Sequence, residues 1–382
     1  MFVSLVGTWL QIVAQSWLVF QLTNSALLLG TVGFLNAMPV FFLSLFGGVA
    51  ADRVSKKKIL IFTQTSFMLL AFILAVMTQL RLITTWQIMV IALLDGIVMA
   101  FDAPSRQAVV VELVGRKHLM NAIVLNSVAF NSSRMIGPAL AGILVVWIGL
   151  SGCFYLNGIS FLAVLVALFM INVDGSKKYA AKGSTFANLK EGLSVIRKNR
   201  IILALVGIVG ISSLFGVSYT ILMPIFARDV LHVGLKGFGA LMSSTGIGAL
   251  LGALVLAHLG DRVSKGKLLV AATMVFSLSL ALFSLSAVFY LSVGILVLLG
   301  ASSVIAISLV NTLLQTMSED EFRGRVMSIF MLTFAGMMPF GNLLSGALSQ
   351  VWGVSFTVML EGLICLVFFT IINIKFPEIR KI

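Results

Sequence analysis

Residues 48–58 read Gly-Val-Ala-Ala-Asp-Arg-Val-Ser-Lys-Lys-Lys and form a charged segment between two long apolar stretches. The run Asp52-Arg53-Val54-Ser55-Lys56 returns 209 residues later as Asp261-Arg262-Val263-Ser264-Lys265. A second set keeps the same spacing, because Glu112, Gly115 and Arg116 recur as Glu321, Gly324 and Arg325. Two matches in one register indicate that the chain is a duplication.

The composition places both copies in a membrane. Hydrophobic residues make up 60% of the chain and charged residues only 10%, whereas soluble domains carry about 25% charged residues. A soluble core cannot bury so much apolar surface, so we predict an integral membrane protein. The two cysteines, Cys153 and Cys365, lie far apart in apolar stretches and belong to no spaced Cys/His cluster. We therefore expect ordinary packing for them, with no disulfide, metal or other cofactor.

Twelve apolar segments are long enough to cross about 30 Å of hydrocarbon as helices. Strands of a barrel would be about ten residues long with alternating polarity, which excludes a barrel here. We predict an all-α integral membrane fold with twelve transmembrane helices. They are Phe2–Leu22, Leu27–Ala50, Ile59–Leu80, Trp86–Ser105, Leu119–Ile148, Phe154–Val173, Ile201–Ala227, Phe238–Leu259, Leu268–Phe289, Leu291–Leu314, Val326–Val351 and Val354–Phe376.

The basic residues are distributed unevenly between the two sides of these helices. Of the 26 Lys and Arg, 22 fall in the loops after even-numbered helices, in the central linker and at the C-terminus. Arg81, Arg228 and Lys236 fall on the other side, and Arg134 lies inside a helix. Cytoplasmic loops carry the excess of basic residues, so we predict that both termini are cytoplasmic. The net charge of +13 is then a topology signal with some contact to anionic lipid, and we expect no nucleic-acid partner.

Each copy holds six predicted helices, which gives a parallel repeat about an axis along the membrane normal. We predict an N-terminal six-helix bundle at 1–173, a cytoplasmic linker at 174–200 and a C-terminal six-helix bundle at 201–382. Two similar bundles around a central cavity are typical of alternating access in a secondary transporter. In the linker, an apolar face predicts a short amphipathic surface helix. That face consists of Phe186, Leu189, Leu193 and Ile196, opposite Lys190 and Arg197.

The first charged segment carries a family resemblance. The pattern Gly48-x-x-x-Asp52-Arg53-x-x-Lys56-Lys57, echoed by Asp261, Arg262 and Lys265, resembles the signature loop of the major facilitator superfamily. Other stretches resemble its drug and siderophore exporters, the branch of the macrolide efflux proteins and the enterobactin exporter. They are Gly7-Thr8-Trp9 through Gln15-Ser16-Trp17, Ala103-Pro104-Ser105-Arg106, Asn121-Ala122, Arg134-Met135-Ile136-Gly137-Pro138 and Phe322-Arg323-Gly324-Arg325-Val326. The resemblance covers the whole chain.

Two features depart from the family pattern. The chain starts at Met1-Phe2-Val3, where members normally have a basic amphipathic lead into the first helix. Either the start site is misassigned or the inner end of the first helix is loosely anchored. Many proton-coupled relatives carry an Arg inside the fourth helix, whereas this helix has none before Arg106. The second departure puts that route of proton handling in question.

The resemblance implies that the signature loops hold the inner face closed. We expect Asp52 to cap a helix of the second half, such as the one beginning near Val326, because helix N-termini attract anions. Arg53 is expected to pair with Asp102 at the cytoplasmic end of the fourth helix. The alternative is that Gly48, Lys56, Lys57 and the repeated charges only mark a cytoplasmic turn.

Asp95, Arg134 and Glu361 lie deep within predicted helices, where a charge costs about 2.5–3.5 kcal/mol or more at mid-bilayer. Asp95 and Arg134 lie at similar depth, and we hypothesise an ion pair between them. Such a pair is either a clamp between neighbouring helices or a part of substrate or proton coupling, with Asp95 as the protonation site. Glu361 either bonds within the second bundle or stays protonated, and a role in coupling is the less favoured alternative. In the fifth helix, Gly137, Pro138 and Gly142 resemble the motif of superfamily exporters and suit close helix packing.

By resemblance, the first, fourth, seventh and tenth helices line the substrate pathway. Their candidate cavity residues are Trp9, Gln11, Gln15, Tyr219, Met223 and Asn311. Aromatic and Met side chains with scattered amides suit an amphipathic, weakly specific ligand. We therefore predict an exporter of hydrophobic or amphipathic small molecules in a bacterial cytoplasmic membrane, monomeric, coupled to protons, and without enzymatic activity. The alternatives are a nutrient importer or sodium-coupled transporter, and a membrane sensor or scaffold that moves nothing.

Overall fold

The computed structural model describes residues 1–171, 191, 193–194, 196–260 and 262–382. The described part also excludes the side chains of Leu45, Asp52, Arg116, Lys117, Leu119 and Met120. The chain divides into two compact units. The first consists of Met1–Lys182 with Gly234–Ser243, and the second of Gly183–Val233 with Ser244–Ile382. The stretch Gly234–Ser243 therefore clusters with the first unit, although it lies within the predicted C-terminal bundle.

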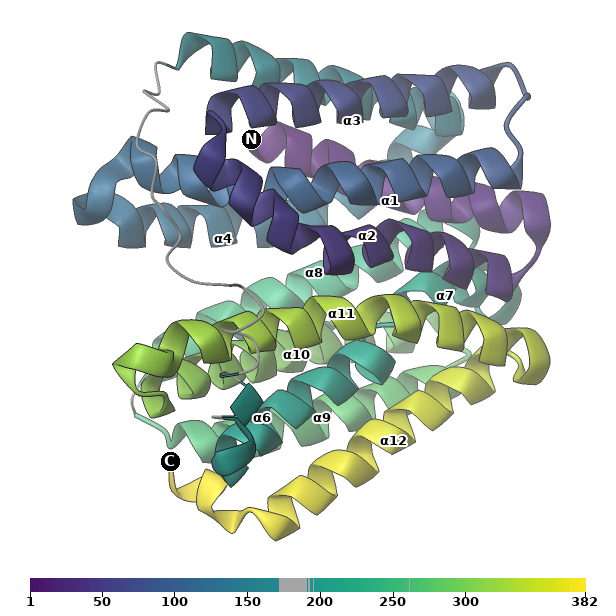
Figure 1. Cartoon of the computed structure of the whole chain (residues 1–382). Coiled ribbons are helices and arrows are strands. Elements are labelled where there is room, and N and C mark those ends of the chain that lie inside the picture. Colours follow the sequence, from purple (N-terminus) through teal and green to yellow (C-terminus); the bar gives the residue numbers. More distant parts are fainter. Residues whose placement is uncertain (172–190, 192, 195, 261) are drawn as a thin grey trace. The chain divides into compact units, whose positions relative to one another are not determined.

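The first unit is built on one long helical run. Its elements are α1 (Phe2–Thr23), α2 (Ala26–Arg53), α3 (Lys56–Gln79) and α4 (Thr85–Met170). α1, α2 and α3 all pack against α4 (Figure 1). Gly115 (φ 66°, ψ 172°) and Gly149 (φ 69°, ψ 179°) interrupt α4 with a backbone that is essentially restricted to glycine. These two residues divide α4 into a first segment (85–114), a second segment (116–148) and a third segment (150–170).

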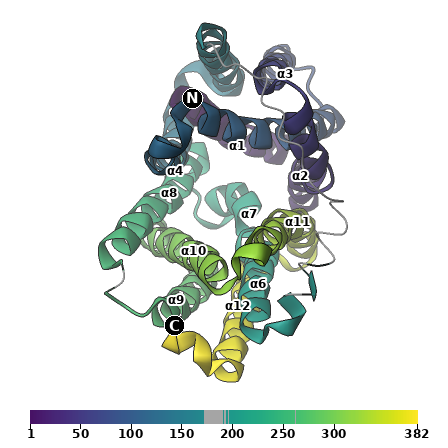
Figure 2. The ribbon, with the colours of Figure 1, turned by 60° about the vertical axis from the view of Figure 1, so that its left-hand side comes forward.

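The second unit begins with a single apolar run that contains two π-helical turns. The run consists of α6 (Arg200–Ile211), η1 (Ser212–Gly216), α7 (Tyr219–Ile225) and η2 (Phe226–Val230). After it come α8 (Gly234–Leu259), α9 (Lys265–Leu285), α10 (Phe289–Met317), α11 (Asp320–Trp352), α12 (Val354–Lys375) and the short 3₁₀ helix η3 (Pro377–Lys381). α9 packs against α10 and α12, and α11 packs against η1 (Figure 2).

The predicted membrane architecture is confirmed. The described residues contain 11 helical stretches long and apolar enough to cross a membrane. One of them, Asn121–Met170, has 50 residues, and Gly149 divides it into two. Twelve segments therefore correspond to the twelve predicted spans, and the fold is an all-α, multi-pass membrane fold.

Several helices continue beyond the predicted apolar spans at their charged ends. α3 begins at Lys56 instead of Ile59, the first segment of α4 runs to residue 114 instead of Ser105, and α11 begins at Asp320 instead of Val326. An apolar span stops at the first charge, but a helix continues where its charges are paired or reach water. These added turns carry Arg106 and Glu112, which matter for the site below.

Glycine permits the same close helix contact in both units. A Cβ on Gly96 of α4 would collide with the carbonyl of Asn36 in α2, and a Cβ on Gly300 of α10 would collide with the carbonyl of Thr245 in α8. Asn36 and Thr245 are 209 residues apart, and Gly96 and Gly300 are 204 residues apart. The duplication is thus visible in helix packing as well as in the loops.

Candidate functional site

The first signature loop, residues 48–58, is fastened to its own unit. Lys56 is 8% exposed, and its ammonium pairs with Glu112 on the first segment of α4. The Nζ of Lys57 donates to the carbonyl oxygen of Ile171, just beyond α4, over 2.6 Å. Lys56 and Lys57 therefore each have an acceptor within the first unit.

The second signature loop, residues 260–267, is also attached to its own unit. The Oγ of Ser264 donates to the carbonyl oxygen of Arg380 in η3 over 3.0 Å, and it accepts from the N–H of Lys267 to cap α9. Each loop thus contacts a backbone carbonyl near the end of its own copy. Arg262 is exposed, and Asp261 lies outside the described residues.

Asp102 is the centre of a buried polar cluster in the first unit. Its side chain is 0% exposed and accepts from Thr63 Oγ1 over 2.8 Å and from Gln64 Nε2 over 2.7 Å. Arg106, one turn further along the first segment of α4, forms an ion pair with the same carboxylate. Three donors satisfy this carboxylate, so removing it would leave a partly buried guanidinium without its counter-charge.

The predicted Arg53–Asp102 pair is wrong. Arg53 is exposed, and every partner recorded for Asp102 among the described residues comes from α3 or from α4 itself. Arg106 lies at i+4 on the same helix and reaches Asp102 without any ordering of a loop. That spacing was visible in the sequence, whereas Thr63 and Gln64 could be found only from how α3 packs on α4. The side chain of Asp52 lies outside the described part, so its capping role stays a prediction.

The matching positions in the second unit carry a neutral pair. Asn311 and Gln315 of α10 lie 209 residues after Asp102 and Arg106. The Nε2 of Gln315 donates to the Oδ1 of Asn311, with the same i, i+4 spacing as the charged pair. Asn311 was predicted to line the substrate pathway, and it is partly exposed.

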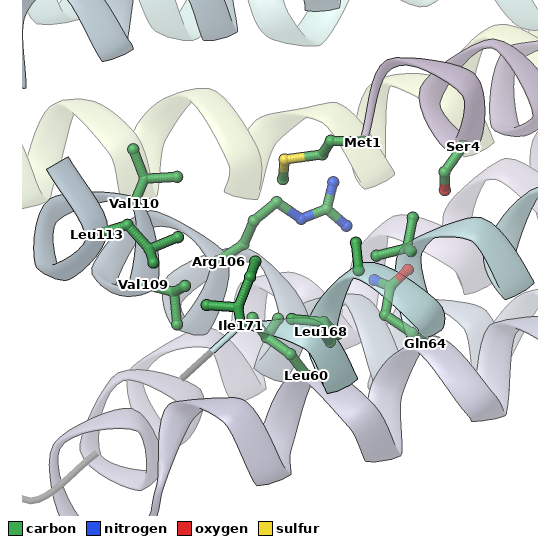
Figure 3. Close-up of a pocket in the computed structure, with 12 residues that line it drawn as sticks. Met1, Ser4, Leu60, Gln64, Arg106, Val109, Val110, Leu113, Leu168 and Ile171 are labelled. Atoms are coloured by element: carbon green, nitrogen blue, oxygen red, sulfur yellow. The ribbon is translucent and has the colours of Figure 1, made fainter. Parts of the chain in front are cut away.

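A small cavity of about 130 Å³ opens beside Arg106. Figure 3 shows the guanidinium of Arg106 directed into the space between Met1 and Gln64. The remaining walls are Ser4, Leu60, Val109, Val110, Leu113, Val164, Ala167, Leu168 and Ile171. Pockets for drug-sized ligands usually measure about 300–1,000 Å³. The cavity is smaller than that and lies inside one bundle, so we do not assign it as the transport site.

The predicted Asp95–Arg134 ion pair is not present. Among the described residues no ion pair includes either side chain; the guanidinium of Arg134 lies over the ring of Trp9. Similar depth does not fix the direction of a side chain around its helix. Gly96, next to Asp95, packs against α2, whereas Gly137, one turn after Arg134, packs against α1. The two charged residues therefore lie on segments of α4 that face different neighbouring helices.

Few contacts offset the free-energy cost of placing the Arg134 charge inside a membrane span. Its guanidinium carbon lies 5.8 Å from the centroid of the Trp9 ring, and such a contact contributes about 2 kcal/mol at best unless it is fully desolvated. Its Nε atom is buried and has no acceptor among the described residues. Since an arginine at mid-bilayer costs about 2.5–3.5 kcal/mol or more, the contact with Trp9 does not offset that cost.

Glu361 bonds within the second unit, as one of the two sequence alternatives proposed. It is 1% exposed, and it accepts from the hydroxyl of Ser345 on α11. Its second oxygen, Oε2, has no donor among the described residues. Glu361 therefore connects α12 to α11.

The candidate pathway residues differ in exposure. Gln11 is buried and accepts from Asn157 Nδ2 over 2.7 Å. Tyr219 and Met223 are 2% and 0% exposed, and the Tyr219 ring packs against Phe283 of α9. These three side chains therefore lie in helix–helix contacts and do not face open space in this structure. Trp9 and Gln15 on α1 are partly exposed, and their place on the substrate pathway stays a prediction.

The Gly137-Pro138 motif permits close packing on two sides of the second segment of α4. A Cβ on Gly137 would lie 2.8 Å from the carbonyl of Val6 and would also meet Trp9. A Cβ on Gly142 would lie 3.1 Å from the carbonyl of Lys236, within the part of α8 that belongs to the first unit. The motif thus brings α1 close to the turn that carries Arg134.

Comparison with known proteins agrees with these features. The family described as "Transmembrane secretion effector" matches residues 1–382. The chain is 29% identical to "Staphyloferrin A transporter" of Staphylococcus aureus over 96% of this chain and 92% of the relative. It is 24% identical to "Macrolide efflux protein A" of Streptococcus pyogenes over 97% and 93%, and 26% identical to "Enterobactin exporter EntS" of Citrobacter koseri over 85% and 77%.

Solved structures share the fold at lower sequence identity. The nucleoside transporter NupG superposes with a TM-score of 0.76 at 14% identity, covering 98% of this chain and 96% of that chain. A bacterial homolog of the human lysosomal transporter Spinster gives a TM-score of 0.76 at 13% identity, covering 99% and 97%. At these identities the likeness establishes the architecture alone.

Proposed function

Because the chain belongs to the transmembrane secretion effector family, a group of major facilitator transporters, we propose that it exports amphipathic small molecules from the cytoplasm by alternating access. The observation that carries the proposal is the duplication, expressed in two signature loops that each bond to a backbone carbonyl near the end of their own copy. A parallel repeat of this kind gives a transporter two similar bodies around one substrate path. Relatives named for macrolide efflux and enterobactin export support the outward direction.

The orientation in the membrane follows from the loop charges. Of the 26 basic residues, 22 lie on the side of the signature loops and the termini, so we assign that side to the cytoplasm. The predicted location is the cytoplasmic membrane of a bacterium, with the bilayer and the substrate as partners of a monomeric chain.

Proton antiport is the proposed energy source, with Asp95 as the proton carrier. An ionisable residue inside a membrane span is a functional candidate by default. No hydrogen bond or ion pair of the Asp95 side chain is recorded within the described part of the chain, so this carboxyl is not committed to holding two helices together. Glu361, in contrast, is bonded to Ser345, and we assign it a structural role.

Transport by the purified protein in liposomes tests this proposal. We expect a macrolide and a lipophilic fluorescent dye to accumulate in the lumen of vesicles whose protein has its cytoplasmic loops outside, when the lumen is made acidic. Protein-free vesicles and vesicles without a pH gradient are the controls. Substrate entry only from the opposite side would show an importer, and no substrate-dependent flux at all would favour a sensor or scaffold.

The role of the signature loops is tested by Asp52→Asn. We propose that this carboxylate helps to hold the cytoplasmic face closed, so the variant should insert normally and transport at least tenfold more slowly. Lys58→Gln, on the same loop but outside the Gly48-x-x-x-Asp52-Arg53-x-x-Lys56-Lys57 pattern, is the control and should keep most of the flux. Near-normal flux through Asp52→Asn would exclude the closing role.

A further inference from the structure

One intramembrane cation lies beside two aromatic rings. Arg134 and Phe130 are one turn apart on the second segment of α4, and Trp9 faces them from α1. The Arg134 guanidinium carbon lies 5.8 Å from the Trp9 centroid, and the Trp9 and Phe130 rings meet edge to face at 6.0 Å. All three residues belong to the first unit. Close packing at Gly137 keeps α1 against this turn.

The cation needs an anion that the described part of the first unit does not supply. A guanidinium cannot neutralise itself by losing its proton in a protein. Glu112 is paired with Lys56, and Asp102 is paired with Arg106. Asp95 lies on a different segment of α4 and forms no recorded pair with Arg134. The buried Nε of Arg134 is still without an acceptor among the described residues.

The side chains of Arg134, Trp9 and Phe130 are accessible to a ligand. Phe130 is 45% exposed, and Trp9 and Arg134 are partly exposed. The planar fork of a guanidinium matches a carboxylate with two parallel hydrogen bonds. Aromatic rings beside it offer an apolar surface for the rest of the same molecule.

We propose that Arg134, Trp9 and Phe130 form a subsite for an amphipathic carboxylate, which pairs with the guanidinium and lays its apolar body against the two rings. This inference rests on the proposed export function and specifies the class of cargo. It makes Arg134 a specificity-determining residue, so a carboxylate is favoured over a neutral molecule of the same shape.

A matched pair of fluorescent probes tests the proposal. Dansyl-phenylalanine and its methyl ester share one body and differ in the carboxylate, and the dansyl group accepts energy transfer from tryptophan. We expect the wild-type protein in detergent to bind the carboxylate at least tenfold more tightly than the ester. Arg134→Gln should bind the two probes equally. Arg134→Lys keeps the charge but loses the fork, and it should retain a reduced preference.

Two control variants distinguish a loss of carboxylate recognition from a loss of folding. Arg81→Gln removes an exposed cation between α3 and α4 and should leave the preference unchanged. Trp9→Phe should reduce the energy-transfer signal while the carboxylate remains the preferred probe. Should Arg134→Gln unfold, the reduced preference of Arg134→Lys decides the matter by itself.

The proposal is overturned if the wild-type protein binds the two probes equally or binds neither, or if Arg134→Gln keeps the full preference. These binding measurements need no transport. Flux of the macrolide in liposomes together with equal probe binding would contradict the carboxylate subsite alone. Carboxylate-selective binding without any flux would contradict the export function and leave the subsite in place.

Discussion

The two units share one helical plan and differ in the charges placed upon it. Asp102 and Arg106 of the first unit correspond to Asn311 and Gln315 of the second, 209 residues later. Both pairs bond across one helical turn, one as ions and one as amides. The duplication has therefore kept the geometry of the pair and changed its charge.

Other intramembrane charges follow the same rule. In the helix contacts, Asp95 directly precedes Gly96 as Leu299 precedes Gly300, and Arg134 lies three residues before Gly137 as Met338 does before Gly341. The second unit instead has Glu361, which lies eight residues after Gly353 as Asn157 lies eight residues after Gly149 in the first unit, and which is bonded to Ser345. Among the described residues, the ion pair at Asp102 and the charges of Asp95 and Arg134 lie in the first unit, and we propose that this unit carries the proton chemistry.

The end of the fourth helix of each copy shows a second difference. Gly115 interrupts α4 with φ 66°, whereas Gly324, its counterpart, lies inside α11. In the second unit the break comes earlier, at Ser318 and Glu319, between α10 and α11. The longer helix of the first unit places Glu112 on Lys56. Its counterpart Glu321 is exposed in the first turn of α11.

The largest effect is expected from neutralising Asp102. Asp102→Asn leaves Arg106 without its counter-charge, and removing one partner of a buried pair costs about 3–5 kcal/mol. Because the Arg106 side chain is 24% exposed, we expect the lower end of this range, a loss of about 3 kcal/mol in the free energy of unfolding measured in detergent micelles. Asn311→Ala in the second unit should cost about 1 kcal/mol, the usual worth of one hydrogen bond.

A double variant sharpens this comparison. Asp102→Asn/Arg106→Gln gives the first unit the amide pair of the second, and it should recover more than half of the lost stability. The reciprocal Asn311→Asp/Gln315→Arg should destabilise the protein, because Ala272 stands where Thr63 supplies a donor to Asp102. If both double variants changed the free energy of unfolding equally, the assigned difference between the two units would be contradicted.

Alanine substitutions at Gly115 and Gly324 should change the free energy of unfolding in opposite directions. Gly115→Ala forces a side chain into a backbone region that costs roughly 1–3 kcal/mol outside glycine, although no atom lies within 4 Å of the added Cβ. Gly324→Ala meets the same open space in a helix interior, where alanine gains about 0.5–1 kcal/mol over glycine. Thermal unfolding of the two variants checks the signs. A loss of stability in both would show that Gly324 has a role beyond its helix.

The smallest effect in the series concerns the paired glutamates. Glu112→Gln leaves the largely buried Lys56 without its anion, and we expect a loss of about 1–2 kcal/mol. Glu321→Gln removes an exposed acid at a helix N-terminus, worth about 0.3–1 kcal/mol. Raising the salt concentration should reduce the effect of Glu321→Gln more than that of Glu112→Gln. Comparable losses that respond equally to salt would mean that Glu112 is as solvated as its counterpart.

The sequence predicted the spans and the duplication because both depend only on the order of residues along the chain. The predicted Arg53–Asp102 pair was wrong because Arg106, on the same helix as Asp102, lies closer to it than the loop that carries Arg53. It failed for Asp95 and Arg134 because depth along a helix says nothing about the face from which a side chain projects. It missed the Lys56–Glu112 pair because an apolar span ends at Ser105, whereas the helix itself continues to residue 114.

The most direct test of the first unit's electrostatic role is proton movement coupled to substrate, followed with a pH-sensitive dye inside proteoliposomes. With the cytoplasmic loops outside, a macrolide added outside should enter the lumen in exchange for protons, so the dye should report a rise in lumenal pH. We predict that Asp95→Asn loses this proton signal and that Glu361→Gln keeps it. An unchanged signal in Asp95→Asn, or its loss only in Glu361→Gln, would contradict the account and assign the coupling to the second unit.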